Sequence, residues 1–295
     1  MSIKDLPKKL YKYKAISDDV LNGLRQGKVW FSHLDQLNDP YENDYDYDDS
    51  IFFSNLDCYL KSFPSEGMPQ NINAKIKELK WQKRSDEFII NFLERLCKDG
   101  GLRLLLNKWK EAIRYHKSHK AGILSLSEDK NNELMWSHYG DQHKGMCMEF
   151  STEENADILN DEKLTYKVVY SDNHYNMMDV FPFYSSEYPN KTQDEIEQGI
   201  CIPKVYAHKS TVWKYEKEWR VISDITNQKE SYDKTGALEP FPGKLTAIYF
   251  GELATEEKIN ATKQAVIDGN YGYLPNFKKA RRMSGSSYGH DFIDV

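Results

Sequence analysis

The strand-forming and helix-forming stretches of this chain are segregated along the sequence, and this segregation most constrains its fold. Short runs rich in β-branched and aromatic residues occupy the beginning and the second half, whereas apolar residues at helical spacing fill the middle. Such an order is typical of α+β folds. We expect an α+β protein with a mixed or mostly antiparallel sheet core and a helical insertion at about residues 70–116.

The beginning of the chain predicts a strand, a short helix and a second strand. Leu10–Lys14 is extended in character, Ser17 can cap a helix that runs through Leu24, and Gly27 can end it. In the second half, a helix capped by Thr255 should span Glu256–Asp268. The other expected strands are Val29–Ser32, Gly122–Ser127, Gly145–Phe150, Lys163–Tyr170, Trp219–Ser223 and Leu245–Phe250.

No repeat or low-complexity linker divides the chain, so residues 1–295 are expected to form a single domain. In the middle, Ile72, Ile76 and Leu79 fall at helical spacing, and Gly100 and Gly101 interrupt the pattern. The acidic and aromatic stretch 171–198 is irregular. It is either a lid or an irregular loop.

Composition excludes some classes of protein. The formal net charge of −6 argues against a protein that coats nucleic acid. A basic group of Lys278, Lys279, Arg281 and Arg282 is either a solvated loop, which base rates favour, or a phosphate-binding patch. The beginning has no apolar signal region and no run reaches the length of a membrane span, which predicts a cytoplasmic protein without a membrane partner.

The four cysteines indicate neither a zinc site nor a disulfide framework, because they are widely spaced and form no CxxC pair. No metal cofactor is therefore expected. Cys147 lies in an apolar run that resembles a strand, which predicts a buried free thiol.

Two motifs near the beginning are candidates for binding a nucleotide. On a strand, Tyr11 and Tyr13 would project to one face and Lys12 to the other, where its ammonium could bind phosphate. The alternative is a solvent-facing lysine on an edge strand. The second motif comprises Phe31, Ser32, Asn38, Asp39 and Glu42. It could orient a ribose or coordinate a hard cation, or its polar residues could simply cap the turn before Pro40.

A third motif, Asn131–Gly140, combines a histidine with aromatic residues. Helical spacing would bring Met135 beside His138 and Tyr139, and Trp136 beside Tyr139. A histidine among aromatic residues is suited to base stacking or to acid–base chemistry. A cluster that only stabilises the fold would contain the same types of residue.

The fourth motif, Lys209–Arg220, contains Trp213 and two glutamates spaced two residues apart. If a strand begins at Tyr215, then Glu216, Glu218 and Arg220 share one face. These charges form either a solvated salt-bridge ladder, which base rates slightly favour, or the wall of a binding site in which one carboxyl has a raised pKa.

Together, the four motifs resemble the domain of unknown function 2971 family. The resemblance rests on LYKY at the beginning, VWFS leading to LNDPYE, the run MWSHYGDQHKG, and the late run that ends in YEKEWR. The resemblance covers nearly the whole chain, from Leu10 to about Gly251, and the motifs occur in the family's order.

The same motifs are distantly similar to ADP-ribosyltransferases, which implies NAD as substrate in a cleft between two half-sheets. The transferases share a three-part signature. In that comparison Lys12 takes its first position, and Glu216 with Glu218 takes its third. The second position is taken either by Ser125 with Ser127 or by Tyr139. The resemblance implies that Glu218 stabilises the ribosyl cation, that Glu216 activates the acceptor, and that Tyr139 or Trp136 stacks on nicotinamide. It also implies a toxin or phage-defence role for a bacterial transferase.

Two other classes of function stay open. A metal-dependent nuclease or phosphodiesterase could use Asp39, Glu42, Glu216 and Glu218 together with Lys209 or His138. Alternatively, a non-enzymatic module could hold a ligand or partner without chemistry. The sequence does not identify the acceptor, which could be a protein or a nucleic acid.

Overall fold

The computed structural model describes residues 5–39, 45–46, 75, 78–85, 88, 91–92, 95, 121–173, 175–176, 206–224, 236–282 and 289–295. The chain divides into two compact units. The first comprises residues 1–42, 118–172 and 207–295, and the second comprises residues 43–117 and 173–206. Because two units of one chain can still unfold together, the single domain expected from the sequence stays a prediction.

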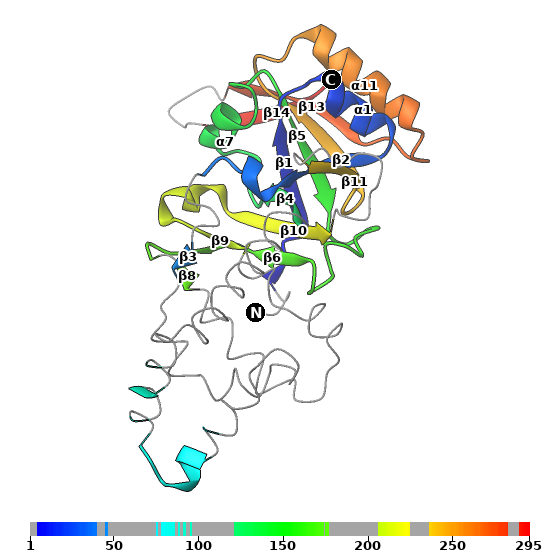
Figure 1. Ribbon diagram of the computed structural model, residues 1–295. Coiled ribbons are helices and arrows are strands. Elements are labelled where there is room, and N and C mark those ends of the chain that lie inside the picture. Colours follow the sequence, from blue (N-terminus) through cyan, green and yellow to red (C-terminus); the bar gives the residue numbers. More distant parts are fainter. Residues whose placement is uncertain are drawn as a thin grey trace. The chain divides into compact units, whose positions relative to one another are not determined.

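A mixed, mostly antiparallel sheet of ten strands forms the centre of the first unit, as far as the described residues show (Figure 1). Its main path runs in the order β11-β2-β4-β1-β5-β12-β13-β14, and β10 pairs with both β4 and β6. The pairing of β12 with β13 is parallel, and the other pairings are antiparallel. The expected α+β class is confirmed.

The strands of this sheet are β1 (Lys9–Lys14), β2 (Lys28–His33), β4 (Ala121–Ser127), β5 (Met146–Ser151), β6 (Thr165–Lys167), β10 (Glu218–Asp224), β11 (Gly236–Pro240), β12 (Leu245–Phe250), β13 (Asn276–Arg282) and β14 (His290–Asp294). A separate short pair in the first unit joins β7 (Val169–Tyr170) to β9 (His208–Lys209). The helices of this unit are α1 (Asp18–Arg25), η2 (Leu34–Gln36), α7 (Glu133–His138), η4 (Thr211–Glu216) and α11 (Glu256–Gly269), of which η2 and η4 are 3₁₀ helices.

Two helices, α1 and α11, lie side by side over one face of the sheet (Figure 1). Ser17 caps α1 by accepting a hydrogen bond from Val20 N, and Thr255 caps α11 by accepting one from Lys258 N. Gly27 follows α1 with φ +65°, a backbone region that glycine enters without steric cost. The predicted caps and helix ends are therefore confirmed to within one residue.

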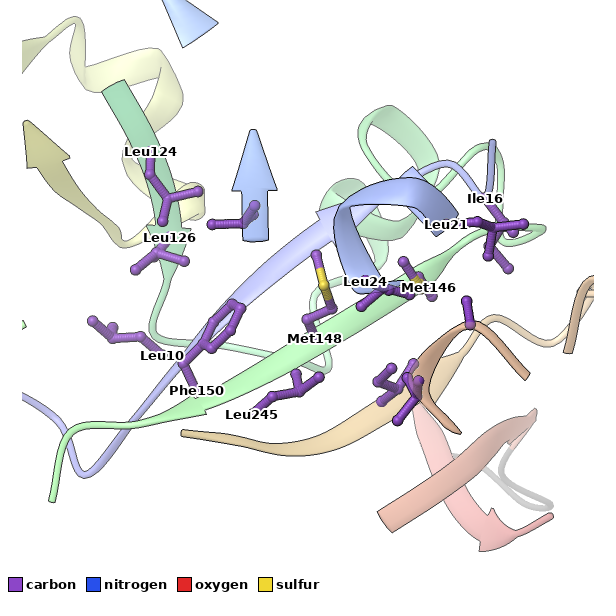
Figure 2. Close-up of a cluster of buried hydrophobic side chains, with 14 of the residues drawn as sticks. Leu10, Ile16, Leu21, Leu24, Leu124, Leu126, Met146, Met148, Phe150 and Leu245 are labelled. Atoms are coloured by element: carbon purple, nitrogen blue, oxygen red, sulfur yellow. The ribbon is translucent and has the colours of Figure 1, made fainter. Parts of the chain in front are cut away.

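The main core lies between these helices and the sheet. Figure 2 shows part of it, with Met146, Met148 and Phe150 along β5 and with Leu21 and Leu24 from α1. Alternate residues of a strand point to opposite faces, so every second residue of β5 reaches this core.

The opposite face of the sheet is covered by α7. Tyr13, Cys147 and Tyr249 come from neighbouring strands and pack against Met135 and Trp136 of α7. Both faces of β5 are thus covered, and all six of its residues are buried, which is typical of a central strand. The prediction of a buried Cys147 thiol is confirmed.

The C-terminal part departs from the sequence interpretation. The basic residues of 278–282 belong to strand β13, whereas base rates favoured a solvated loop. β13 pairs in parallel with β12 and buries Ala280. Arg281 and Arg282 at its end are both exposed, and its four charged residues resemble loop composition more than the apolar runs that identify strands.

The expected strand Lys163–Tyr170 is also wrong in one respect, because Val168 divides it. β6 pairs with β10, whereas β7 pairs with β9. Val168 N donates to the carbonyl of Glu218 between these two pairings.

In the second unit, β3 (Tyr45–Asp46) pairs in parallel with β8 (Tyr175–Asn176). The residues described between 75 and 95 are helical at 75, 78–81, 88, 91–92 and 95, in agreement with the predicted helical insertion at these positions. The rest of 70–116 and most of the stretch 171–198 lie outside the described residues. Within the described part of the chain, no helix is both long and apolar enough to cross a membrane.

Candidate functional site

The fourth motif folds as a 3₁₀ helix followed by a strand. η4 ends at Glu216, Lys217 adopts the left-handed conformation with φ 46° and ψ 53°, and β10 begins at Glu218. The expected strand start at Tyr215 is therefore wrong. The carboxylates on either side of this left-handed residue both contact the ammonium of Lys209.

Four charged residues form a buried group, here called the Lys209 cluster: Lys209, Glu216, Glu218 and Arg220. Lys209 Nζ lies 2.7 Å from Glu216 Oε2 and 3.4 Å from Glu218 Oε2. Arg220 donates from Nε to Glu218 Oε1 at 2.9 Å and from Nη2 to Oε2 at 3.1 Å. The two cations and two carboxylates balance in formal charge, which is what permits their burial.

The alternation of side chains along β10 places these charges away from the core. Trp219 and Val221 belong to the main core. Glu218 and Arg220 face the other side. The four side chains of the cluster are between 1% and 4% exposed, so the solvated ladder favoured by base rates is wrong.

The two carboxyl groups have opposite pKa shifts. Burial raises the pKa of Glu216, and the nearby Lys209 only partly offsets this. Burial acts in the same direction on Glu218, but the charges of Arg220 and Lys209 and a hydrogen bond from Ser125 lower its pKa below the ordinary value. Glu218 therefore stays ionised, while Glu216 is the carboxyl of the pair that binds a proton more readily.

A chain of hydrogen bonds leads from Glu216 towards solvent. Tyr139, which follows α7, donates from its phenol to Glu216 Oε1 at 2.6 Å. Asn38 Nδ2 donates to the same phenol oxygen at 2.6 Å, and Asn38 is exposed. Burial, followed by the charge of Glu216, raises the pKa of Tyr139, so its phenol stays protonated and acts as a donor.

Lys12 is next to this group. Its strand β1 lies between β4 and β5, so the alternative of a solvent-facing lysine on an edge strand is wrong. Lys12 Nζ donates to the carbonyl of Ser125 at 2.9 Å. Burial, with a further effect of Lys14, lowers the pKa of Lys12 to about 7. Lys12, Tyr139 and Glu218 thus converge on one connected network.

Other predicted residues support the same network. Ser127 Oγ donates to the carbonyl of Glu216 at 2.7 Å. The ring of Trp213 lies 4.8 Å from Lys209 Nζ, a cation–π contact. His138 is exposed, with its ring 6.4 Å from that of Tyr215. One participant was not singled out from the sequence: Tyr170 accepts a hydrogen bond from Glu218 N at 2.8 Å.

Several candidates lie in the interior instead. Tyr11, Tyr13 and Trp136 belong to the apolar cluster under α7. Phe31 belongs to the main core. Since Trp136 has no exposed surface, its ring cannot stack on a ligand in this conformation. Ser32 is half-buried on β2, Asp39 is buried with partners of its own, and Glu42 lies outside the described residues.

The fold and the site define an α+β protein with a buried, charge-balanced cluster. A family model described as "Protein of unknown function (DUF2971)" matches residues 135–221, which run from α7 to β10. This match supports the resemblance to that family over a segment that contains the Lys209 cluster and Tyr139. No curated protein and no solved structure matches the chain significantly. The similarity to ADP-ribosyltransferases stays a prediction.

Proposed function

We propose that this protein is a nucleotide-handling enzyme that transfers an ADP-ribosyl group from NAD, with the Lys209 cluster and Tyr139 as its reaction centre. The observation that carries the proposal is the position of Glu216. It is a buried carboxyl with a raised pKa, and Tyr139 and Asn38 connect it to solvent. A carboxyl of this kind is suited to take up or release a proton during a reaction.

The chemistry requires two electrostatic contributions. When the bond between ribose C1′ and the nicotinamide nitrogen breaks, its electron pair leaves with nicotinamide and positive charge develops on the ribose. An acceptor hydroxyl, or water, forms the new bond to C1′ and gives up its proton. A carboxylate near C1′ stabilises the developing positive charge, and a second basic group takes the proton.

The proposal distributes these roles differently from the sequence comparison, for a geometric reason. Glu218 holds Arg220 through two hydrogen bonds and contacts Lys209, so its charge is already neutralised by protein groups. Glu216 is contacted by Lys209 and Tyr139. In the proposal, Glu216 exchanges a proton with the substrate through the phenol of Tyr139, and Glu218 positions Lys209 and Arg220.

The cationic partners favour this function over the metal-dependent nuclease. A two-metal mechanism needs carboxylates whose free oxygens face the metal ions. Here Lys209 and Arg220 contact both oxygens of Glu218, and Lys209 and Tyr139 contact both oxygens of Glu216. A cation added at either carboxylate would first have to displace an ammonium or a guanidinium group.

The test is release of nicotinamide from NAD by the purified protein, with and without candidate acceptors. We expect release by the unaltered protein and a loss of at least tenfold in Tyr139→Phe, which keeps the ring and removes the hydroxyl that contacts Glu216. Glu216→Gln should reduce release further, because it removes the basic oxygen. The matched control is Glu162→Gln, an exposed residue outside the cluster.

Folding is checked by circular dichroism and by the melting temperature of each variant. Absence of nicotinamide release together with absence of an NAD-dependent rise in melting temperature would overturn the proposal. So would release that is unchanged in both Tyr139→Phe and a folded Glu216→Gln.

A further inference from the structure

Among the described residues, one group of side chains has the composition of a metal site: Glu133, His143 and His290, here called the Glu133 cluster. One donor atom of each residue lies within 4.8 Å of the donor atoms of the other two. Glu133 is in the first turn of α7, His143 is in the turn after α7, and His290 begins β14. The cluster is separate from the Lys209 cluster, with which it shares no residue.

Each histidine of this cluster has one ring nitrogen without a hydrogen-bond partner, whereas Nε2 of His143 lies 3.3 Å from Ser137 Oγ. The Nδ1 atoms of His143 and His290 are buried, and neither atom donates or accepts a hydrogen bond. His290 is 8% exposed, and its Nδ1 lies 3.1 Å from Glu133 Oε1 without the alignment of a hydrogen bond. Glu133 Oε2 also lies 3.8 Å from Nε2 of His143. Buried polar atoms without partners are rare in native proteins and call for an explanation.

The backbone holds His143 in place at a steric cost. Asp141, Gln142 and His143 have φ values of 51°, 53° and 65°, a run of three left-handed residues of which none is glycine. Such conformations are costly and persist where the surroundings require them. The ring of His143 is stacked on the buried Trp136 with an interplanar angle of 17°, which fixes its orientation.

Two imidazoles and one carboxylate are ligands suited to a divalent transition metal. Zn²⁺ takes nitrogen and oxygen ligands at about 2.1 Å, so neighbouring ligands of a tetrahedral ion are roughly 3.4 Å apart. The donor atoms of the cluster are at most 4.8 Å apart, so neighbouring donors need to approach each other by up to about 1.4 Å. Glu133 can supply this movement because its side chain is 47% exposed.

From this geometry we infer that the Glu133 cluster binds one Zn²⁺ ion, with the exposed side of Glu133 leaving a fourth position for water. Three protein ligands and one open position are the arrangement in which Zn²⁺ can activate a bound water. The ion would also link β14 to α7 and so fix the helix that precedes Tyr139. Cysteine spacing, on which the sequence interpretation of metals rested, carries no signal for such a site.

The test is titration of the metal-free full-length protein with ZnCl₂ by calorimetry. One equivalent should bind with micromolar or tighter affinity and raise the melting temperature. His143→Ala and Glu133→Gln should each weaken binding at least tenfold, since a lost ligand removes one of three bonds. His138→Asn and Glu162→Gln are the matched controls, because both residues are exposed and lie outside the cluster; neither should change the affinity.

A second measurement does not depend on the fold of the variants. Co²⁺ bound to the unaltered protein should give the visible absorption of a four-coordinate site, and added Zn²⁺ should abolish it. Absence of Zn²⁺ binding by the unaltered protein would overturn the inference, as would an affinity that His143→Ala and Glu133→Gln leave unchanged. Neither result depends on whether the protein acts on NAD.

Discussion

The phenol of Tyr139 donates a 2.6 Å hydrogen bond to the carboxylate of Glu216, although 77 positions separate the two residues in sequence. The contact joins the end of α7 to the end of η4. Burial raises the pKa of both partners, so the Tyr139 phenol stays protonated and Glu216 binds a proton more readily than an ordinary carboxyl. The pair therefore couples a protonated donor to a carboxyl that is able to change its charge.

Replacing Lys209 by methionine should destabilise the protein strongly. The ammonium of Lys209 contacts both Glu216 and Glu218, and its loss leaves two buried carboxyl groups without a shared cation. Removing one partner of a buried ion pair costs about 3–5 kcal/mol. Urea-induced unfolding of Lys209→Met should show a decrease of this size in the free energy of unfolding.

The control for Lys209→Met is Lys8→Met. Lys8 forms an ion pair with Glu153 in which the side chains are 80% and 60% exposed. Such a pair contributes about 0–1 kcal/mol. The double variant Lys209→Met/Glu216→Gln should recover part of the loss, because it removes the buried carboxylate that lost its cation, whereas Glu218 keeps Arg220. Equal effects of Lys209→Met and Lys8→Met would contradict the structure of the cluster.

The strands and helices of the first unit were largely predictable from the sequence because local signals specify them. Ser17 and Thr255 cap their helices where the sequence places them, and the apolar run at Cys147 forms a central strand. β13 was missed because four charged residues conceal its pattern. Its position depends on β12, the strand it pairs with, and on the burial of Ala280, which local sequence does not reveal.

The candidate site was predictable in its residues but not in its geometry. The spacing of Glu216 and Glu218 identified the motif, whereas the left-handed conformation of Lys217 determines where both carboxylates point. A strand from Tyr215 was the natural expectation because left-handed lysines are rare and no glycine marks the turn. The Glu133 cluster depends on contacts between residues far apart in the chain, which spacing rules do not detect.

The stability of the protein should rise between pH 7 and pH 9.5, in part because of Lys12. Burial lowers the pKa of Lys12 to about 7 in the folded state, whereas an unfolded lysine titrates at about 10.4. Between these values the unfolded state binds more protons, so the free energy of unfolding increases with pH, by at most about 1.4 kcal/mol per pH unit for this group. Lys12→Met should reduce that slope in urea unfolding measured at several pH values.

The control for Lys12 is Lys163→Met, since Lys163 is exposed. Its variant should keep the slope of the unaltered protein. Lys14 has a lowered pKa because of burial and should account for the slope that remains in Lys12→Met. A slope that does not change in Lys12→Met would show that Lys12 is charged in the folded state up to high pH.

Cys147 should resist alkylation while the protein is folded. Its thiol is completely buried, so the reagent cannot reach it. Burial also raises the pKa of the thiol well above the ordinary value, so the reactive thiolate does not form. Native protein treated with iodoacetamide should carry no label on the peptide that contains Cys147, as read by mass spectrometry. The same peptide should be fully labelled in guanidinium chloride. Rapid labelling under native conditions would mean that β5 opens frequently.

Gly251→Ala should destabilise the protein more than Gly272→Ala, although Gly272 has a positive φ that alanine rarely adopts. A Cβ on Gly251 would lie 2.1 Å from the carbonyl oxygen of His143, and both partners of this clash are held by the main chain. Overpacking of this kind costs about 3 kcal/mol. Gly272 has φ +78° and nothing within 4 Å of its added Cβ, so its variant should lose only about 1 kcal/mol through backbone strain. Thermal unfolding of both variants measures the difference. If Gly251→Ala were no worse than Gly272→Ala, the turn at His143 would be able to move, and the fixed orientation required for the Glu133 cluster would be lost.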